Sequence, residues 1–343
     1  MNDSMEQTLR QVLAAFGPSG HEFQGVTACI RALVEDVVDE IRTDALGNLI
    51  CVKHGADRSQ QALLMAHMDH VGLMVTEITE QGFLRVTPVG GLRPDLLLYR
   101  QVVFANGTHG VVSHESGLDL KTTDLTIKHL YVDIGAASRE DAERLVSVAD
   151  VCIYAPCTVA LANRRIAAPA MDDRAGCAVV IETLRRLAGC PRDVCAVFSV
   201  QEELGLRGAT VAAYGLHPEF AVALDVCPTG DTPNAAPLGI ELGKGPALKV
   251  MDAHSISHVG LRRYMERKAQ ALRLPFQLEI LAYGGTDSAA IQRSRDGVAS
   301  ATLSIPSRYV HSACEIVDLD DMDNAVTLLT AMLADPNIAA EAL

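Results

Sequence analysis

Short apolar runs rich in β-forming residues alternate with segments of helical period along this chain, and this alternation restricts the possible folds more than any other feature. The pattern is typical of a mainly parallel β-sheet covered by helices on both faces, so we predict an α/β fold. The expected strands are 62–66, 194–200, 220–224 and 299–305. The expected helices are 4–16, 22–37, 173–187, 257–272 and 320–333.

The residue pattern changes between residues 73 and 165. Short segments of alternating apolar and polar residues, such as GFLRVTPV and RQVVFANGTHGVVS, are interrupted there by Gly, Asn and Pro. Little helical period is present there, which favours short strands. We interpret 73–165 as a small β-rich domain inserted into the α/β domain. The catalytic domain would then be discontinuous, built from residues 1–72 and 166–343.

Composition excludes several classes of function. A net charge of −14 argues against a nucleic-acid or anionic membrane partner, because either needs a basic surface. No apolar stretch is long enough to cross a bilayer, and the first residues lack the pattern of a signal peptide. The nine cysteines are odd in number and contain no C-x-x-C pair, so we expect reduced thiols in a cytoplasmic protein.

Metal-competent side chains follow several of the predicted strands. Ligands in open α/β sheets bind beyond the carboxyl ends of the strands, so these residues could converge. The five places are His67-Met68-Asp69, Asp172-Asp173, Glu202-Glu203, Asp225, and His311.

Each of these places has an ordinary interpretation when taken singly. His67 and Asp69 could form a surface or capping pair, although a carboxylate two residues away could also orient a metal-binding imidazole. Glu202 and Glu203 could lie in a solvated loop, and Asp172 and Asp173 could simply cap a helix. Asp225 is harder to dismiss because it ends the apolar run FAVAL, where an unpaired charge is costly to bury.

Together these places supply imidazoles and carboxylates without a thiolate. Such a donor set suits a pair of divalent ions that share a carboxylate. In that arrangement one residue of the Glu202-Glu203 pair could bind metal while the other holds a proton near the bound water.

The chain also resembles the tetrahedral aminopeptidase family, which includes glutamyl, leucyl and lysyl aminopeptidases. The resemblance covers nearly the whole chain and rests on motifs in a fixed order. These motifs include FGPSGHE, TDALGNLI, MAHMDHVGLMV, MDDRAGCAVVIETL, SVQEELGLRGA, ALDVCPTGDTP, YGGTDSAAI and RYVHSACE.

The resemblance implies a role for each of these residues. Glu202 matches the general base, and Asp69 matches the carboxylate that orients the first histidine. The implied metal ligands are His67, Asp172, Glu203, Asp225 and His311, with Asp172 bridging the two ions. One ion would be held by His67, Asp172 and Asp225, and the other by Asp172, Glu203 and His311. Zinc is the expected metal, and cobalt and manganese accept similar ligands.

Two positions depart from the family pattern. The family usually has Glu after its His-x-Asp motif, whereas this chain has His70, and the segment before Asp172 reads AAPA without an expected Gly. His70 could alter substrate preference or compete as a ligand. The more ordinary interpretation is that the His70 imidazole lies behind the ligands or at the surface.

The implied reaction is removal of residues from the free amino ends of short peptides, with a metal-activated water and Glu202 as general base. By resemblance the insert would serve assembly of a homo-oligomer, commonly a dodecamer. Other hypotheses are a related metal-dependent deacylase or carboxypeptidase, a glycosidase, and a non-catalytic scaffold. The amino-terminal residue that the enzyme prefers is not indicated by the sequence.

Overall fold

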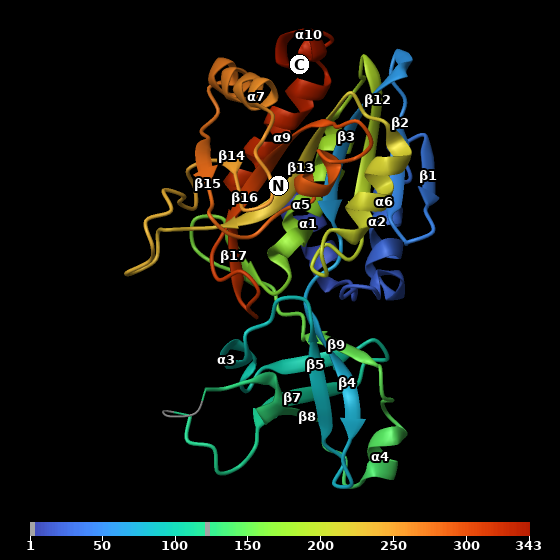
Figure 1. The fold of residues 1–343 in the computed structure, drawn as a ribbon, viewed down its shortest axis with the longest axis vertical. Helices are drawn as coiled ribbons and strands as arrows, with labels where there is room; N and C mark the ends of the chain where they lie inside the picture. The colour runs from blue at the N-terminus through green and yellow to red at the C-terminus, as the bar shows by residue number, and fades with distance from the viewer. Residues whose placement is uncertain (1–3, 121–123) are drawn as a thin grey trace.

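The chain folds around an eight-stranded sheet, with a separate closed barrel at one end of the molecule (Figure 1). The computed structural model describes residues 4–120 and 124–343. In spatial order the strands of the large sheet are β1 (Glu40–Thr43), β2 (Leu49–Lys53), β12 (Arg192–Ser199), β3 (Asp57–His67), β13 (Phe220–Pro228), β16 (Ala299–Ser307), β14 (Ala247–Met251) and β15 (Gln277–Ile280).

The four central strands, β12, β3, β13 and β16, run parallel to one another. Their carboxyl ends therefore lie at one edge of the sheet. β3 and β12 stay in register up to the pair of His67 and Ser199, and β13 pairs with β16 as far as Pro228 and Ser307. The predicted α/β class with a mainly parallel sheet is confirmed.

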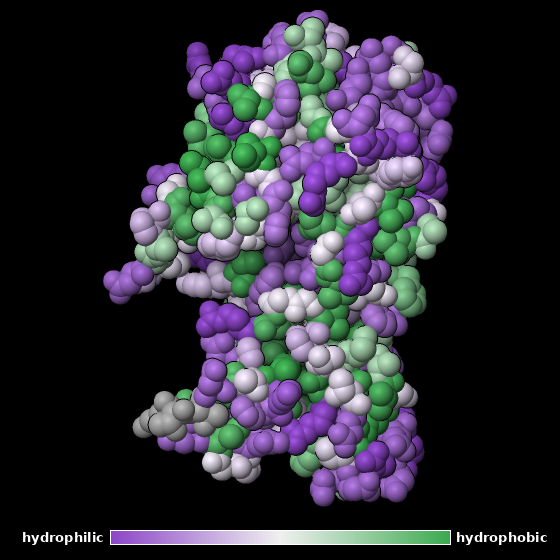
Figure 2. Space-filling view, in the orientation of Figure 1, coloured by the Kyte–Doolittle hydropathy of each residue, from purple (hydrophilic) through white to green (hydrophobic). Residues whose placement is uncertain are grey.

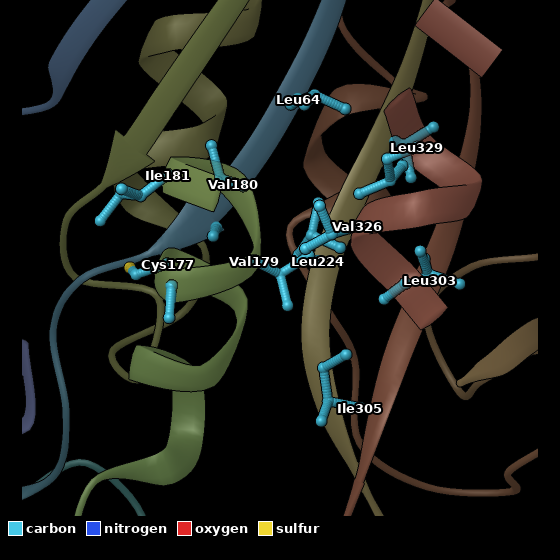
Figure 3. Close-up of a cluster of buried hydrophobic side chains, with 14 of the residues drawn as sticks. Leu64, Cys177, Val179, Val180, Ile181, Leu224, Leu303, Ile305, Val326 and Leu329 are labelled. Atoms are coloured by element: carbon cyan, nitrogen blue, oxygen red, sulfur yellow. The ribbon is translucent and has the colours of Figure 1, made fainter. Parts of the chain in front are cut away.

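Helices cover both faces of this sheet. They are α1 (Ser4–Ala14), α2 (Val26–Val34), α5 (Met171–Arg186), α6 (Arg207–Leu216), α7 (Val259–Leu272), α8 (Ser288–Ile291), α9 (Leu319–Leu333) and α10 (Ile338–Ala342). Side chains alternate across β3, so Leu64 packs into the larger core with α5 and α9 (Figure 3), while Leu63 and Met65 pack with α6 and α8.

The barrel closes through the strand order β4 (Gly72–Ile78), β5 (Leu84–Val89), β8 (Leu130–Asp133), β7 (His109–His114), β6 (Gln101–Phe104) and β9 (Val151–Tyr154). It has its own hydrophobic core, which includes Leu73, Val102, Val112 and Val132. Short helices α3 (Pro94–Leu97), η2 (Ile127–His129) and α4 (Arg139–Glu143) complete this part of the chain. Figure 2 shows a narrow waist between the barrel and the larger body.

A three-stranded antiparallel sheet lies where the chain returns from the barrel. It consists of β10 (Val159–Ala160), β11 (Arg165–Ala168) and β17 (Glu315–Asp318). The pairing of β11 with β17 brings the start of α5 next to the segment that follows β16.

Four of the predicted helices agree with the structure to within two residues at each end, but the helix predicted at 22–37 is interrupted and shorter than expected. Residues Glu22–Gln24 form the short helix η1, and α2 begins only at Val26. The break lies at Gly25, whose backbone packs closely against Phe16. A Cβ atom at residue 25 would stand 2.6 Å from the Phe16 carbonyl oxygen, so the position requires glycine. The backbone N–H of Val26 donates to that same oxygen at 2.8 Å. No helix of the described residues is both long and apolar enough to cross a membrane.

Arg174 fastens the start of α5 to the rest of the body. Its guanidinium is fully buried and donates to four backbone carbonyl oxygens, those of Met68, Val12, Ala15 and Gly17. These carbonyls lie after β3 and around the end of α1, so one side chain joins three segments. Burial lowers the pKa of Arg174, and neighbouring thiols and carboxyls oppose that shift.

We predict that Arg174→Met lowers the free energy of unfolding by about 3 kcal/mol or more, because each buried carbonyl left without a donor costs about 1–3 kcal/mol. Urea unfolding in the presence of a chelator measures this without a contribution from bound metal. The control is Arg186→Met, whose side chain is 40% exposed and pairs with Asp323. That surface pair should contribute less than about 1 kcal/mol, and equal losses in the two variants would refute the assigned role.

Candidate metal centre

The polar residues predicted from the strand ends lie close together at the carboxyl edge of the large sheet. His67 is the last residue of β3, Asp225 lies near the end of β13, and Glu202 and Glu203 follow β12. Asp172 is the second residue of α5 and has non-helical backbone angles, and His311 follows β16. The central strands are neighbours, so their ends bring these side chains together.

His67, Asp172 and Asp225 form the first set of converging ligand atoms. His67 Nε2 lies 3.0 Å from Asp172 Oδ1 and 3.9 Å from Asp225 Oδ1. The other ring nitrogen, Nδ1, donates to the backbone carbonyl oxygen of Asp69 at 3.1 Å. Since a carbonyl can only accept, this contact leaves the Nε2 lone pair directed at the carboxylates.

Asp172, Glu203 and His311 form the second set. His311 Nε2 lies 3.3 Å from Asp172 Oδ2 and 3.0 Å from Glu203 Oε1. Its Nδ1–H donates to the backbone carbonyl oxygen of Gly91 at 2.7 Å. Both histidines therefore present Nε2 to the carboxylates, and the two oxygens of Asp172 face different histidines.

Divalent cations fit these residues. Glu203 Oε1 is buried and, among the residues that the structure describes, has no hydrogen-bond partner, although it lies close to His311 Nε2. Burial raises the pKa of Asp225 well above its usual range, and Asp172 adds to the shift. Burial lowers the pKa of His311, but the adjacent carboxylates of Asp172 and Glu203 outweigh it and raise the pKa to about 12. The pocket thus favours positive charge strongly.

The carboxylate of Asp69 connects the ends of β3 and β12. It is fully buried and accepts backbone N–H groups from Glu202 at 3.0 Å and Glu203 at 3.3 Å, as well as the hydroxyl of Ser19. Its Oδ1 lies 3.5 Å from His67 Nδ1, farther than the backbone oxygen of the same residue. Asp69 therefore positions both His67 and the Glu202-Glu203 pair.

Glu202 lies beside the first set without belonging to it. Its Oε2 is 4.0 Å from His67 Nε2, and its side chain is 12% exposed. Burial raises the pKa of Glu202 well above its usual range, and the carboxylates of Asp225, Asp287 and Glu203 add to this against the opposing effect of His67. A carboxylate with a raised proton affinity suits proton transfer.

A cavity of about 660 Å³ lies against the two ligand sets. Asp225 and Glu202 line one part of it, and Tyr309 lines another. Arg93, which lies between β5 and α3, and Lys249 of β14 also border the cavity. Its size is within the usual range for a pocket that binds a small ligand.

His70 is buried, so the suggestion of a surface imidazole is wrong. Its Nδ1–H donates to the Val71 carbonyl oxygen at 2.8 Å, and burial lowers its pKa to about 3. His70 lines a small cavity of about 10 Å³ together with Asp172, Glu203 and His311. It belongs to neither set of converging ligand atoms among the described residues.

Some residues of the site carried no role in the sequence analysis. Glu315 is buried and contacts the backbones of both Asp172 and His311. Gly91 lies between β5 and α3 and supplies the carbonyl that holds His311. Glu315 ends the motif RYVHSACE, which was a usable signal, whereas nothing in the sequence around Gly91 indicates its contact.

The family model for M42 glutamyl aminopeptidase matches residues 47–328 of this chain. A putative aminopeptidase of Acetivibrio thermocellus is 40% identical over 328 residues, which cover 95% of this chain and 98% of that protein.

Solved structures agree with the sequence comparisons. The aminopeptidase APDkam598 of the archaeon Desulfurococcus kamchatkensis superposes with a TM-score of 0.94 at 34% identity, covering 98% of this chain and 97% of that one. The TET1 peptidase of Pyrococcus horikoshii, described as assembling into a tetrahedron or a large octahedral shell, gives a TM-score of 0.85 at 32% identity. That alignment covers 96% of this chain and 99% of the other.

We predict that Asp172→Asn reduces metal binding more than Asp69→Asn does. Asp172 offers an oxygen to each ligand set, whereas Asp69 only positions other residues, and losses of such supporting contacts are about 10–100-fold in affinity. Atomic absorption on the two purified variants, dialysed against the same metal buffer, measures the difference. Equal metal content in both would contradict the shared position of Asp172.

Proposed function

The chain belongs to the M42 glutamyl aminopeptidase family, and from this premise we propose that it is a two-metal aminopeptidase acting on the free amino ends of short peptides. The observation that carries the proposal is the position of Asp172 between the two sets, with one oxygen near His67 and the other near His311. A carboxylate shared in this way supports a pair of divalent ions. Zinc is the proposed metal, with cobalt and manganese as alternatives.

The residues of the site divide the chemistry between them. When bound, the two ions would activate a water molecule and polarise the scissile carbonyl. Glu202 is close enough to the first set to take a proton from that water and return it to the leaving amine. Asp69 holds the backbone of Glu202 in place through the N–H contact at 3.0 Å.

The cavity supports binding of one terminal residue next to the ligand sets. Glu202, a carboxylate that belongs to neither ligand set, lines the metal-side wall of the cavity and would attract the ammonium group of a free amino end. This attraction favours an exopeptidase over a deacylase, whose substrate has no free amine.

The proposal is tested with a matched pair of reporter substrates, an aminoacyl anilide with a free amine and its N-acetylated counterpart. We expect hydrolysis of the free-amine substrate only, and loss of that activity in a chelator. Preference for the acetylated substrate would indicate a deacylase. Activity on glycosides that resists the chelator would indicate a glycosidase, which needs two carboxylates and no metal.

We predict that Glu202→Gln retains the fold and the bound metal but loses about 10²–10⁴-fold in kcat, because an amide cannot accept the proton of the water. Steady-state kinetics with metal counted on the same samples measures this. Near-normal turnover in a variant with full metal content would remove Glu202 from the role of general base.

The domain division, with residues 73–165 as an insert between 1–72 and 166–343, also remains a proposal. The insert would carry assembly, since the P. horikoshii TET1 peptidase forms large shells and the described part of the barrel contributes no side chain to either ligand set. A dodecamer and a cytoplasmic location are predictions of the same account.

We predict that the intact protein is a homo-oligomer, and a dodecamer is the expected form. Multi-angle light scattering at working concentration gives the mass directly. A clean monomer of 36.6 kDa would contradict the assembly role of the insert.

A further inference from the structure

The carboxylate of Glu315 joins the two chain segments that carry the ligands of the second set. Its Oε1 accepts the backbone N–H of His311 at 2.6 Å, and its Oε2 accepts the backbone N–H of Asp172 at 3.0 Å. Glu315 is only 2% exposed. Both oxygens are therefore used in holding backbone groups, and neither belongs to a ligand set.

The fold explains how one side chain reaches both segments. Glu315 is the first residue of β17 and pairs with Ala168 at the end of β11. Asp172 is four residues after Ala168, and His311 is four residues before Glu315. The strand pair thus places the Glu315 carboxylate between the backbones of Asp172 and His311.

His311 needs such a contact because its backbone conformation is unusual. Its φ angle of 62° lies in the left-handed region, which residues other than Gly adopt infrequently. Glu315 holds its backbone N–H, while Gly91 holds its ring Nδ1–H at 2.7 Å. A Cβ atom on Gly91 would lie 3.3 Å from the imidazole, so a larger residue there would crowd the ring. The direction of Nε2 is fixed from two sides.

Burying the charged carboxylate of Glu315 between these two backbones costs electrostatic free energy. Glu315 is buried, and a charge removed from water costs free energy. A neutral hydrogen-bond acceptor would avoid that cost, but an amide has only one acceptor oxygen and its NH₂ group would face a second N–H donor. The requirement for two acceptors accounts for a glutamate.

We propose that Glu315 is a positioning residue that sets the affinity of the second ligand set, Asp172, Glu203 and His311, for its divalent ion. This inference rests on the proposed two-metal function. The first set should be affected less, because Glu315 contacts only Asp172 among its three residues, whereas in the second set it contacts both Asp172 and His311.

The test uses Glu315→Gln, titrated with zinc after metal removal and followed by calorimetry. We expect the second ion to bind about 10–100-fold more weakly than in the wild-type protein, as for other residues that support metal ligands. The first ion, whose ligands include Asp172 but not His311, should lose less affinity than the second. Raising the zinc concentration should restore kcat, which would not happen if the variant were simply misfolded.

Glu182→Gln is the matched control. Glu182 is also 2% exposed, and both oxygens of its carboxylate also accept hydrogen bonds, from the hydroxyls of Thr8 and Ser4 and from the guanidinium of Arg185. It lies near the far end of α5 and should leave the affinity for both ions unchanged. Equal weakening in Glu182→Gln and Glu315→Gln would overturn the proposal, as would wild-type affinity in Glu315→Gln.

A second variant keeps the test decisive if Glu315→Gln does not fold. Glu315→Asp retains a carboxylate but is one methylene shorter, so it can reach only one of the two N–H groups. The same selective loss of the second ion is expected, and unchanged affinity would overturn the proposal. A wild-type protein that binds fewer than two ions would overturn the proposed function itself, which separates the two failures.

Discussion

The shared carboxylate of Asp172 is the contact on which the rest of the site depends. It lies between two imidazoles, with Oδ1 at 3.0 Å from His67 Nε2 and Oδ2 at 3.3 Å from His311 Nε2. Asp225 and Glu203 are buried beside it, and carboxylates this close repel each other in a medium of low polarity. Cations bound at this site would offset these charges, so we expect metal to add to the stability of the fold.

Hydrogen bonds with uncharged backbone groups hold most of these side chains in position. Backbone carbonyls of Asp69 and Gly91 fix the rings of His67 and His311. In the opposite sense, the carboxylates of Asp69 and Glu315 accept backbone N–H groups of the segments that carry ligands. The parallel strands set the approximate positions, and these contacts set the final directions.

The barrel contributes to the site through a backbone carbonyl. Gly91, just after β5, supplies the carbonyl for His311, and Arg93 borders the cavity. The part of the chain that we propose for assembly therefore also touches a candidate metal ligand. A displacement of the barrel would change the support of His311 without any change in the ligands themselves.

The convergence of the candidate ligand side chains followed from the sequence more readily than the contacts that support them. His67, Glu203 and Asp225 stood out because polar residues followed apolar strands, and parallel neighbours must bring such ends together. Glu315 lies in the motif RYVHSACE, but neither its role nor that of Gly91 could be assigned, because these roles exist only once β17 pairs with β11 and the barrel approaches His311. The missed break at Gly25 has the same origin, since it depends on the approach of Phe16.

The central claim is that Asp172 contacts two ions in one site, and an anomalous difference map from zinc-grown crystals tests it most directly. The account predicts two peaks in each chain. One would contact His67 and Asp225, the other Glu203 and His311, and Asp172 would contact both. A single peak, or two peaks of which Asp172 contacts at most one, would contradict it.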